Sequence, residues 1–423
     1  MSDRTNTNGA RPRVLVLGAG FAGIGAAQKL HKSDVDVVIV DQHDYHTFQP
    51  LLYQVATGLL DQPAVGHPIR DLIHEQDNAR LHTDRVTGID LDARQVQFAE
   101  LEPIAYDYLV LGLGAEVNYF GVEGAAEHAF PLYTLPDAVR LKDQVLRMWE
   151  AADKHPDLIE DGALNIVVVG GGPTGVETAG ALAELYNGVF RKDYPDIAED
   201  ASRILLVEAS PEIFSMFKQD LRTYAVDALT KRGVEVMTGD VVESISPSRV
   251  KLKSGKELKA HTLVWGAGLQ GNALVQSLGL ELERGNRIAV DGDLRLPSHP
   301  EVFAVGDIAA ITDPKTDQVL PQLGSVALQS GEHAGETIAH LAAGKETKPF
   351  KYRDKGTMAT IGRGSAVVQM LGGKSMKGKK AQLAWGTVHL ALLPTNEDRA
   401  KAVVEWAGAG LTHQRSARIT VET

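Results

Sequence analysis

The sequence contains no cysteine among its 423 residues. A chain without thiols can form neither a disulfide nor a thiolate metal site, and it cannot supply the redox-active dithiol of a disulfide reductase. This absence excludes the cysteine-dependent classes of redox enzyme. It also fits a cytoplasmic location, where disulfides are rare.

Long apolar runs and a positive net charge are missing as well. No stretch of apolar residues is long enough for a membrane-spanning helix, and a net charge of −12 argues against nucleic acid as a partner. Residues 1–11 are polar, so a disordered start without a signal peptide is predicted. His43 and His46 are close in sequence, but no third ligand follows at a suitable spacing, so no metal site is predicted.

One glycine pattern is present twice, each time directly after a short apolar run at 14–17 or 166–169. Each run is typical of a buried parallel strand, and each loop opens onto a segment with helical character. The glycines allow a tight turn and a close approach to a pyrophosphate, for which the helix N-terminus supplies N–H donors. An α/β fold with two Rossmann-like dinucleotide-binding domains is therefore predicted. The glycines are Gly18, Gly20 and Gly23 in the first copy and Gly170, Gly172 and Gly175 in the second.

An acidic residue follows the second strand of each copy. Strand 35–40 ends at Asp41, roughly 20 residues beyond the first glycines, where a carboxylate can accept both ribose hydroxyls. Strand 204–207 is followed by Glu208, although a polar insertion at 187–201 lengthens the spacing. A carboxylate at this position repels a 2′-phosphate, so NADH is predicted to be preferred over NADPH.

Two further strand-like segments also end in glycine and support an internal duplication. Residues 106–114 end at Gly114, and residues 262–268 end at Gly268. The predicted organisation is a first dinucleotide domain over 12–159 and 276–345, a second over 160–275, and a small C-terminal region over 346–423. A charged helix is expected over 136–155.

The order of these elements resembles the two-dinucleotide flavoproteins of the glutathione reductase type. In that class FAD takes the first loop and the nicotinamide cofactor takes the second, so the resemblance implies that Phe21, Gly306 and Asp307 contact FAD. Residues 46–58, 170–180, 263–268 and 358–363 more closely resemble segments of the type II NADH dehydrogenases. Together these segments span roughly residues 12–370.

The resemblance implies an enzyme that takes hydride from NADH onto non-covalent FAD and reduces a quinone, menaquinone or ubiquinone, without pumping protons. It places Glu177 near the contact between nicotinamide and flavin. From its position two residues past Gly175, the Glu177 carboxylate is expected in the first helical turn, where the helix dipole would stabilise it. The alternative is a glutamate that serves only local electrostatics.

For the quinone, the family has an Ala-Gln pair followed by a second glutamine four residues later. This sequence keeps the later one as Gln329 and has Gly324-Ser325 in place of the pair. Gln329 is expected to hydrogen-bond a quinone carbonyl and Ser325 to replace part of the lost amide, or 325–340 is simply the helix that covers the flavin. Two other functions remain open: a soluble NADH diaphorase or ferredoxin-type reductase, and a flavoprotein that senses NADH.

The C-terminal region retains two apolar segments, 382–393 and 402–411, which resemble the family's amphipathic helices at the membrane surface. Four lysines precede them: Lys374, Lys377, Lys379 and Lys380. They suit either an anionic membrane surface or a solvated loop. Peripheral binding on the cytoplasmic face and assembly into a homodimer both stay open.

Overall fold

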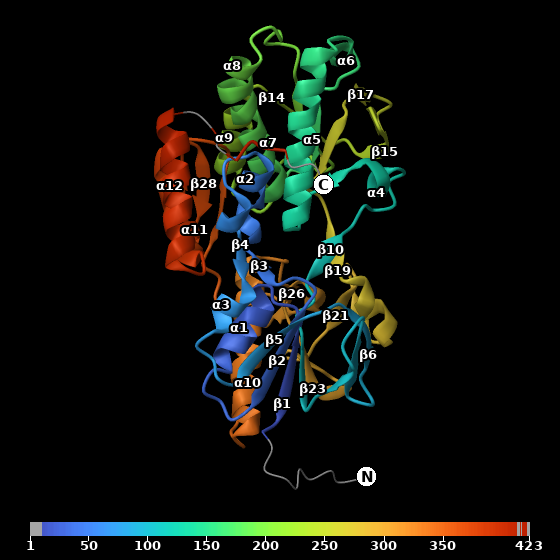
Figure 1. Cartoon of the computed structure of the whole chain (residues 1–423), viewed down its shortest axis with the longest axis vertical. Helices are drawn as coiled ribbons and strands as arrows, with labels where there is room; N and C mark the ends of the chain where they lie inside the picture. The colour runs from blue at the N-terminus through green and yellow to red at the C-terminus, as the bar shows by residue number, and fades with distance from the viewer. Residues whose placement is uncertain (1–10, 413–414, 416, 421–423) are drawn as a thin grey trace. The chain divides into compact units, whose positions relative to one another are not determined.

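The computed structural model describes residues 11–412, 415 and 417–420, so residues 1–10 of the predicted disordered start lie outside the described part. The chain forms two compact units (Figure 1). Unit 1 contains the chain up to residue 47 together with 67–116 and 269–353. Unit 2 contains 48–66, 117–268 and the chain from 354 onward.

Unit 1 is built on a six-stranded sheet with the order β22-β23-β9-β1-β2-β5. Neighbouring strands are parallel except β22, which is antiparallel to β23. The central strand β1 is buried between β2 and β9, which explains its unbroken apolar run. The strands predicted at 14–17 and 35–40 are confirmed, whereas only the middle of segment 106–114 is a strand. The strands are β1 (Arg13–Leu17), β2 (Asp36–Asp41), β5 (Ala79–Thr83), β9 (Tyr108–Leu111), β22 (Arg295–Leu296) and β23 (His299–Ala304).

Two helices of unit 1, α1 (Phe21–Lys29) and α10 (Gly324–Ala342), pack closely against each other. The close approach depends on glycine, since a Cβ atom at Gly331 would lie 1.9 Å from the carbonyl oxygen of Ala22. Helix α10 is the helix expected over 325–340, and it fixes the start of α1 beside the first glycine loop. Shorter elements of unit 1 are α3 (Ile69–Ile73), β6 (Val86–Asp90), β7 (Gln95–Phe98), β8 (Ile104–Ala105), β20 (Leu282–Glu283), β21 (Arg287–Ala289), β24 (Ala309–Ala310), β25 (Thr312–Asp313) and β26 (Gln318–Val319).

Unit 2 repeats the same plan around a parallel sheet with the order β11-β18-β12-β13-β14. Its first strand, β12, leads through the second glycine loop into α7, as β1 leads into α1. The predicted α/β fold with two Rossmann-like halves is therefore confirmed. The elements are β11 (Phe130–Pro131), β12 (Ile166–Val169), β13 (Ile204–Glu208), β14 (Val234–Thr238), β18 (Thr262–Trp265), α7 (Pro173–Leu185) and α9 (Gln219–Thr230), with the small sheet β15 (Val242–Ser246), β16 (Arg249–Leu252) and β17 (Glu257–Lys259).

The charged helix predicted over 136–155 is α5 (Leu135–Lys154), which begins at a capping box between Thr134 and Asp137. It belongs to unit 2, as do residues 117–159 around it, although the sequence assigned this segment to the first domain. Trp149 of α5 contacts Tyr186 and Phe190 with ring centroids 5.0 and 4.7 Å apart. This contact explains the start of the 187–201 insertion, which continues α7 as a π-helical turn, Tyr186–Phe190, and as α8 (Arg191–Asp193).

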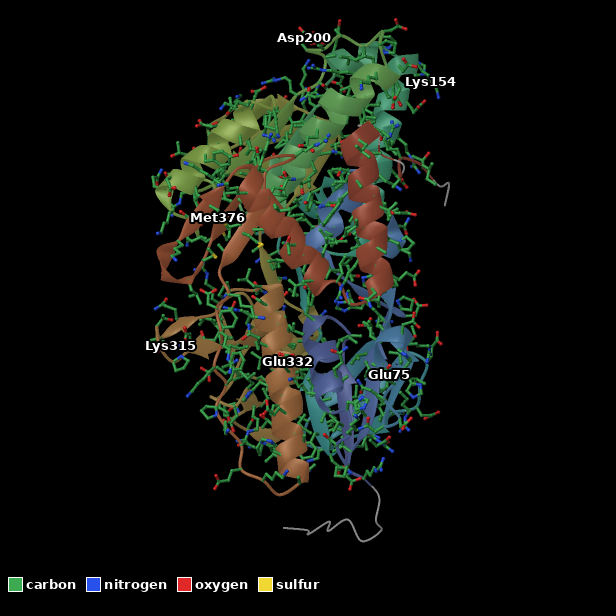
Figure 2. All side chains as sticks on the ribbon, turned by 90° about the vertical axis from the view of Figure 1, so that its left-hand side faces the viewer. Glu75, Lys154, Asp200, Lys315, Glu332 and Met376 are labelled. Atoms are coloured by element: carbon green, nitrogen blue, oxygen red, sulfur yellow. The ribbon has the colours of Figure 1, made fainter. Side chains whose placement is uncertain are left out.

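The C-terminal part of unit 2 is an antiparallel sheet followed by two helices. The strands are β27 (Thr357–Thr360), β28 (Ala366–Gln369) and β29 (Ser375–Lys377), and the helices are α11 (Lys379–Leu392) and α12 (Asn396–Thr412). The two helices lie side by side (Figure 1 and Figure 2), with the Trp385 and Trp406 rings 5.8 Å apart. Of the helices described, none has the length and apolarity needed to cross a bilayer.

Candidate functional site

The first glycine loop connects β1 to α1 and is shaped by two steric requirements. Gly18 has φ +92°, and a Cβ atom there would lie 2.4 Å from the carbonyl oxygen of Gly112. A Cβ atom at Gly23 would lie 1.8 Å from the carbonyl oxygen of Gly18. Both positions therefore need glycine for the fold itself.

The second loop has the same geometry between β12 and α7. Gly170 has φ +108° and faces Gly266, and a Cβ atom at Gly175 would lie 1.8 Å from the carbonyl oxygen of Gly170. The sequence analysis missed Gly112 and Gly266, whose carbonyls approach the loops. Each stands two residues before a predicted crossover glycine, Gly114 or Gly268, so the repeated Gly-x-Gly spacing was the available signal.

The middle glycines, Gly20 and Gly172, behave differently from their neighbours. Their φ angles of −70° and −78° suit any residue, and beyond the adjacent residues no atom in the described part of the chain lies within 4 Å of a Cβ atom built on either one. Neither α1 nor α7 has a side-chain cap or an acidic residue in its first turn. The fold leaves free space and uncapped amides at both loops, an arrangement suited to a bound phosphate.

The two predicted ribose-binding acids also fix the glycine loops. Asp41 accepts a 2.6 Å hydrogen bond from the Ala19 amide and one of 2.8 Å from the His43 amide. Glu208 repeats this arrangement, with bonds of 2.6 Å from Gly171 and 2.7 Å from Ser210. Burial raises the pKa of the Asp41 carboxyl, and the two amide bonds act in the opposite direction.

His46, from the segment after β2, supports the first loop and packs against Phe21 at the start of α1. The Nδ1 atom of His46 lies 2.8 Å from the Ala19 carbonyl oxygen, so this nitrogen carries the hydrogen. Burial lowers the pKa of His46 to about 4, which keeps the ring neutral at physiological pH. The Phe21 ring packs edge-on against His46 with the ring centroids 5.2 Å apart.

The Gly306-Asp307 pair lies beside the same loop. Gly306 has φ +69°, its N–H donates to Ser330 at 3.0 Å, and a Cβ atom there would lie 3.1 Å from Ala22 Cβ. The carbonyl oxygen of Asp307 accepts a 3.0 Å bond from Gln322. Unit 1 therefore brings Asp41 and Gly306 to the first loop and its helix, and Asp307 follows Gly306 in the chain.

The side chains predicted to meet a quinone are held by neighbours in unit 1. Gln329 donates from its amide nitrogen to the carbonyl oxygen of Arg353 at 3.1 Å and accepts from the Arg353 N–H at 3.0 Å. The Ser325 hydroxyl lies 2.9 Å from the Tyr352 hydroxyl. These contacts tie α10 to the 352–353 segment.

Glu177 differs from the expectation in both position and charge. It lies beyond the first turn of α7 and is 8% exposed, so the predicted stabilisation by the helix dipole was wrong. Its Oε1 accepts a 3.0 Å bond from the Thr360 N–H. Burial raises the pKa of the carboxyl to about 8, although the Thr360 amide and the nearby Trp385 indole act in the opposite direction. The carboxyl therefore keeps its proton at neutral pH.

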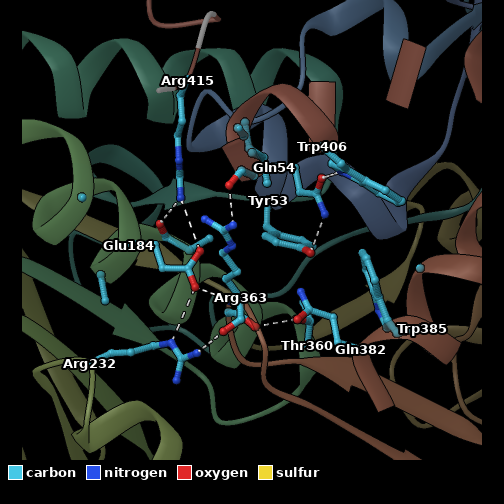
Figure 3. Close-up of a pocket in the computed structure, with 18 of the residues that line it drawn as sticks. Tyr53, Gln54, Glu184, Arg232, Thr360, Arg363, Gln382, Trp385, Trp406 and Arg415 are labelled. Carbon is cyan, nitrogen blue, oxygen red and sulfur yellow. Dashed lines mark hydrogen bonds and ion pairs between the residues drawn. The ribbon is translucent and has the colours of Figure 1, made fainter. Parts of the chain in front are cut away.

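A cavity of about 810 Å³ lies within unit 2, and Figure 3 shows residues that line it. Helices α2 (Leu52–Ala56), α7, α11 and α12 and the turn after β27 form its walls. Its apolar lining includes Leu383, Leu390 and the indoles of Trp385 and Trp406. Thr360, which holds Glu177, also lines the cavity, so the buried carboxyl lies directly behind its wall.

Charged side chains form another part of the cavity wall. Glu184 lies 3.6 Å from Arg232 and 3.7 Å from Arg415, and it also accepts a hydrogen bond from the Arg363 amide. Burial lowers the pKa of Arg415 to about 10, and Glu184 partly opposes this shift. Arg415 also donates to the carbonyl oxygen of Thr57, so the charged network attaches the chain after α12 to the cavity.

The chain is similar in sequence and in fold to known redox enzymes that use nicotinamide cofactors. Residues 12–331 match the family described as pyridine nucleotide-disulphide oxidoreductase. The type II NADH:quinone oxidoreductase Ndh of Mycobacterium tuberculosis is 34% identical over 421 residues, which cover 96% of this chain and 89% of that protein. The internal alternative NAD(P)H-ubiquinone oxidoreductase A1 of Arabidopsis thaliana is 32% identical, and the match covers 94% of this chain and 84% of that protein. The fold is similar to that of NDH2 from Plasmodium falciparum in complex with NADH, at a TM-score of 0.90 and 18% identity over 97% of this chain and all of that one.

Proposed function

The chain belongs to the pyridine nucleotide-disulphide oxidoreductases and, within them, to the type II NADH:quinone oxidoreductases, and from this premise we propose a role for each part of its site. The enzyme oxidises NADH and reduces a quinone without pumping protons. The residues of the first loop would hold FAD, which would supply the hydride acceptor for NADH and the electron donor for the quinone.

The first loop holds FAD, and the second holds NADH. The observation that supports a dinucleotide at each loop is the free space at Gly20 and Gly172, which the fold does not need and which an approaching pyrophosphate would use. In unit 1, Asp41 binds the FAD ribose, and Phe21, Gly114, Gly306 and Asp307 lie along the cofactor. In unit 2, Glu208 binds the NADH ribose and Gly268 lines the same site. The flavin is bound non-covalently in this proposal, and a thioether bond is excluded because the chain has no cysteine.

The quinone occupies the cavity of unit 2. Its apolar helices and indoles suit a planar apolar head group, and its volume of about 810 Å³ lies in the range of small-molecule sites. Glu177 holds a proton behind the wall of this cavity and can supply it during quinone reduction. Gln329 and Ser325 hold α10 to the 352–353 segment. These contacts keep α10 in place against α1, beside the first glycine loop.

The outer faces of α11 and α12 bind an anionic membrane surface on the cytoplasmic side. Leu392, Val404 and Leu411 lie outside the cavity lining and are 48%, 69% and 85% exposed, so the two helices together present several apolar side chains to solvent. The four lysines between 374 and 380 are also exposed, and each can add roughly 1 kcal/mol of attraction to an anionic leaflet. A long-tail quinone would then reach the enzyme from the bilayer.

Anaerobic stopped-flow spectroscopy tests the proposed function. NADH is mixed with the yellow holoenzyme, and the reduced enzyme is then mixed separately with menaquinone, ubiquinone, ferricyanide or oxygen. Rapid bleaching by NADH followed by rapid reoxidation by a quinone is expected. Reoxidation by ferricyanide alone would point to a diaphorase, and a colourless protein that does not take up added FAD would refute the assignment of the first loop.

A further inference from the structure

Three polar side chains from two distant segments of unit 2 form a chain of hydrogen bonds along the wall of the cavity (Figure 3). The Trp406 indole on α12 donates to Gln54 Oε1 at 2.6 Å. Gln54 Nε2 then donates to the Tyr53 hydroxyl oxygen at 2.7 Å. All three residues line the cavity.

The chemistry of these groups fixes the direction of each bond. An indole N–H can only donate, so the atom that faces Trp406 must be the amide oxygen of Gln54. The amide nitrogen therefore faces Tyr53, and because it also only donates, the Tyr53 oxygen must be the acceptor. The hydroxyl hydrogen of Tyr53 is consequently left for a third group.

No acceptor for that hydrogen lies within hydrogen-bond distance among the residues that the structure describes. Tyr53 is only 5% exposed, so its hydroxyl is withdrawn from bulk water. A buried donor without an acceptor in the wall of a cavity indicates a ligand that accepts a hydrogen bond.

We propose that the Tyr53 hydroxyl donates a hydrogen bond to a carbonyl oxygen of the quinone and that Gln54 and Trp406 are positioning residues that keep it oriented as a donor. This inference rests on the proposed function. The head group of a quinone meets this requirement, because its two carbonyl oxygens accept hydrogen bonds. The common quinones carry no N–H or O–H group on the ring. The bond strengthens as negative charge develops on the carbonyl oxygen during reduction.

Tyr53 keeps its own proton throughout. Burial raises the pKa of its hydroxyl well above the usual value of 10, and the nearby Glu177 carboxylate would raise it further. The two protons of the quinol therefore come from elsewhere, while Tyr53 stabilises the developing charge and orients the ring.

The test compares Tyr53→Phe with a matched control, Tyr186→Phe, in the FAD-loaded enzyme. Tyr186 is also a buried tyrosine of unit 2, but its hydroxyl donates to the Leu164 carbonyl oxygen at 3.2 Å and it does not line the cavity. With menadione and decylubiquinone, kcat/KM of Tyr53→Phe should fall about 10- to 100-fold, as expected for a lost bond to a charged group. Flavin bleaching by NADH and ferricyanide reduction should match the control.

A second variant and a binding measurement make the result independent of how well Tyr53→Phe folds. Trp406→Phe should lower the same quinone kcat/KM by a smaller factor, because Gln54 can then turn and Tyr53 can donate to it. Quinone binding without NADH, followed by quenching of tryptophan fluorescence, should weaken in Tyr53→Phe and not in Tyr186→Phe. If kcat/KM and Kd of Tyr53→Phe stay within twofold of the control, Tyr53 is not the donor. If the wild-type enzyme reduces ferricyanide but no quinone, the proposed function itself fails.

Discussion

The backbone N–H of Gly171 donates a 2.6 Å hydrogen bond to Glu208. Glu208, which is predicted to bind the ribose, therefore also stabilises the conformation of the second glycine loop. Replacing it with a residue that cannot accept would disturb the loop as well as the cofactor preference. A variant that tests the preference alone must retain an acceptor oxygen at this position.

Glu208→Gln removes the negative charge and keeps one acceptor oxygen, which can retain the bond from Gly171, while the bond from Ser210 is lost. We expect wild-type enzyme to prefer NADH and the variant to narrow the kcat/KM ratio of NADH to NADPH about tenfold, since two charges about 4–6 Å apart near a surface interact by one to a few kcal/mol. Steady-state kinetics with both cofactors measure the ratio. Asp41→Asn is the matched control, which should lower FAD content and leave the ratio unchanged. Equal wild-type kcat/KM values would mean that Glu208 does not face the ribose.

The glycine loops offer a comparison between neighbouring positions. Gly172→Ala should leave the melting temperature of the apo-protein unchanged and raise the KM for NADH at least tenfold, because the new methyl group enters space that only a ligand would use. Gly175→Ala should destabilise the fold by about 3 kcal/mol, because its Cβ atom would overlap the Gly170 carbonyl oxygen. Calorimetry and NADH titrations separate the two effects. Similar melting temperatures for both variants would contradict this division.

The features that were predictable from sequence are local in the chain. A buried strand, a glycine loop and a helix start follow one another at 13–21 and at 166–173, and an acid ends the next strand of each sheet, so both Rossmann-like halves and their acids could be located. The helix α5 was also predicted from its own pattern. Its membership of unit 2 depends on contacts between Trp149 and the π-helical turn, which no local pattern encodes.

The parts that sequence reasoning missed depend on contacts between distant residues. Glu177 is held by Thr360, 183 positions later, and only that contact shows that the carboxyl is buried. Gln54 meets Trp406 across 352 positions, so the orientation of Tyr53 could not be inferred from the segment around it. Gln329 was interpreted from its motif, whereas its amide pairs with the backbone of Arg353.

Glu177 should make the stability of the protein depend on pH. Its pKa of about 8 in the folded state lies above the ordinary 4.5, so the folded protein binds more protons than the unfolded chain between these values. The free energy of unfolding should therefore fall as pH rises from about 4.5 to 8. Glu177→Gln should remove this contribution, so that its melting temperature relative to wild type increases between pH 5 and pH 8.5. Glu75→Gln, at a side chain that is 83% exposed (Figure 2), should follow the wild-type pH profile.

The pairing of Gln329 with Arg353 predicts a structural role for this glutamine. Gln329→Ala removes two partly exposed hydrogen bonds and should lower stability by about 1–2 kcal/mol. The KM for a short-chain quinone should change less than twofold, as measured with decylubiquinone. A large increase in KM with unchanged stability would instead support the interpretation that Gln329 binds the quinone.

The exposed apolar faces of α11 and α12 predict that membrane binding can be removed by point substitutions. Truncation is unsuitable, because Trp385 is buried and both helices line the cavity. The double variant Leu392→Glu with Val404→Glu should lose binding to phosphatidylglycerol vesicles in a co-sedimentation assay at low salt, and neither side chain lines the cavity. Wild-type binding should itself weaken as salt rises, since ions screen the lysines.

The control for this last experiment is Val319→Glu on β26, an exposed apolar side chain of unit 1 that lies outside the two helices. It should bind vesicles as wild type does. Turnover of long-tail quinones should fall in the double variant alone, while ferricyanide reduction stays equal in all three proteins, because neither substituted leucine nor valine touches a glycine loop. If wild type fails to bind vesicles at low salt, the helices serve only to enclose the cavity, and quinone must reach it from solution.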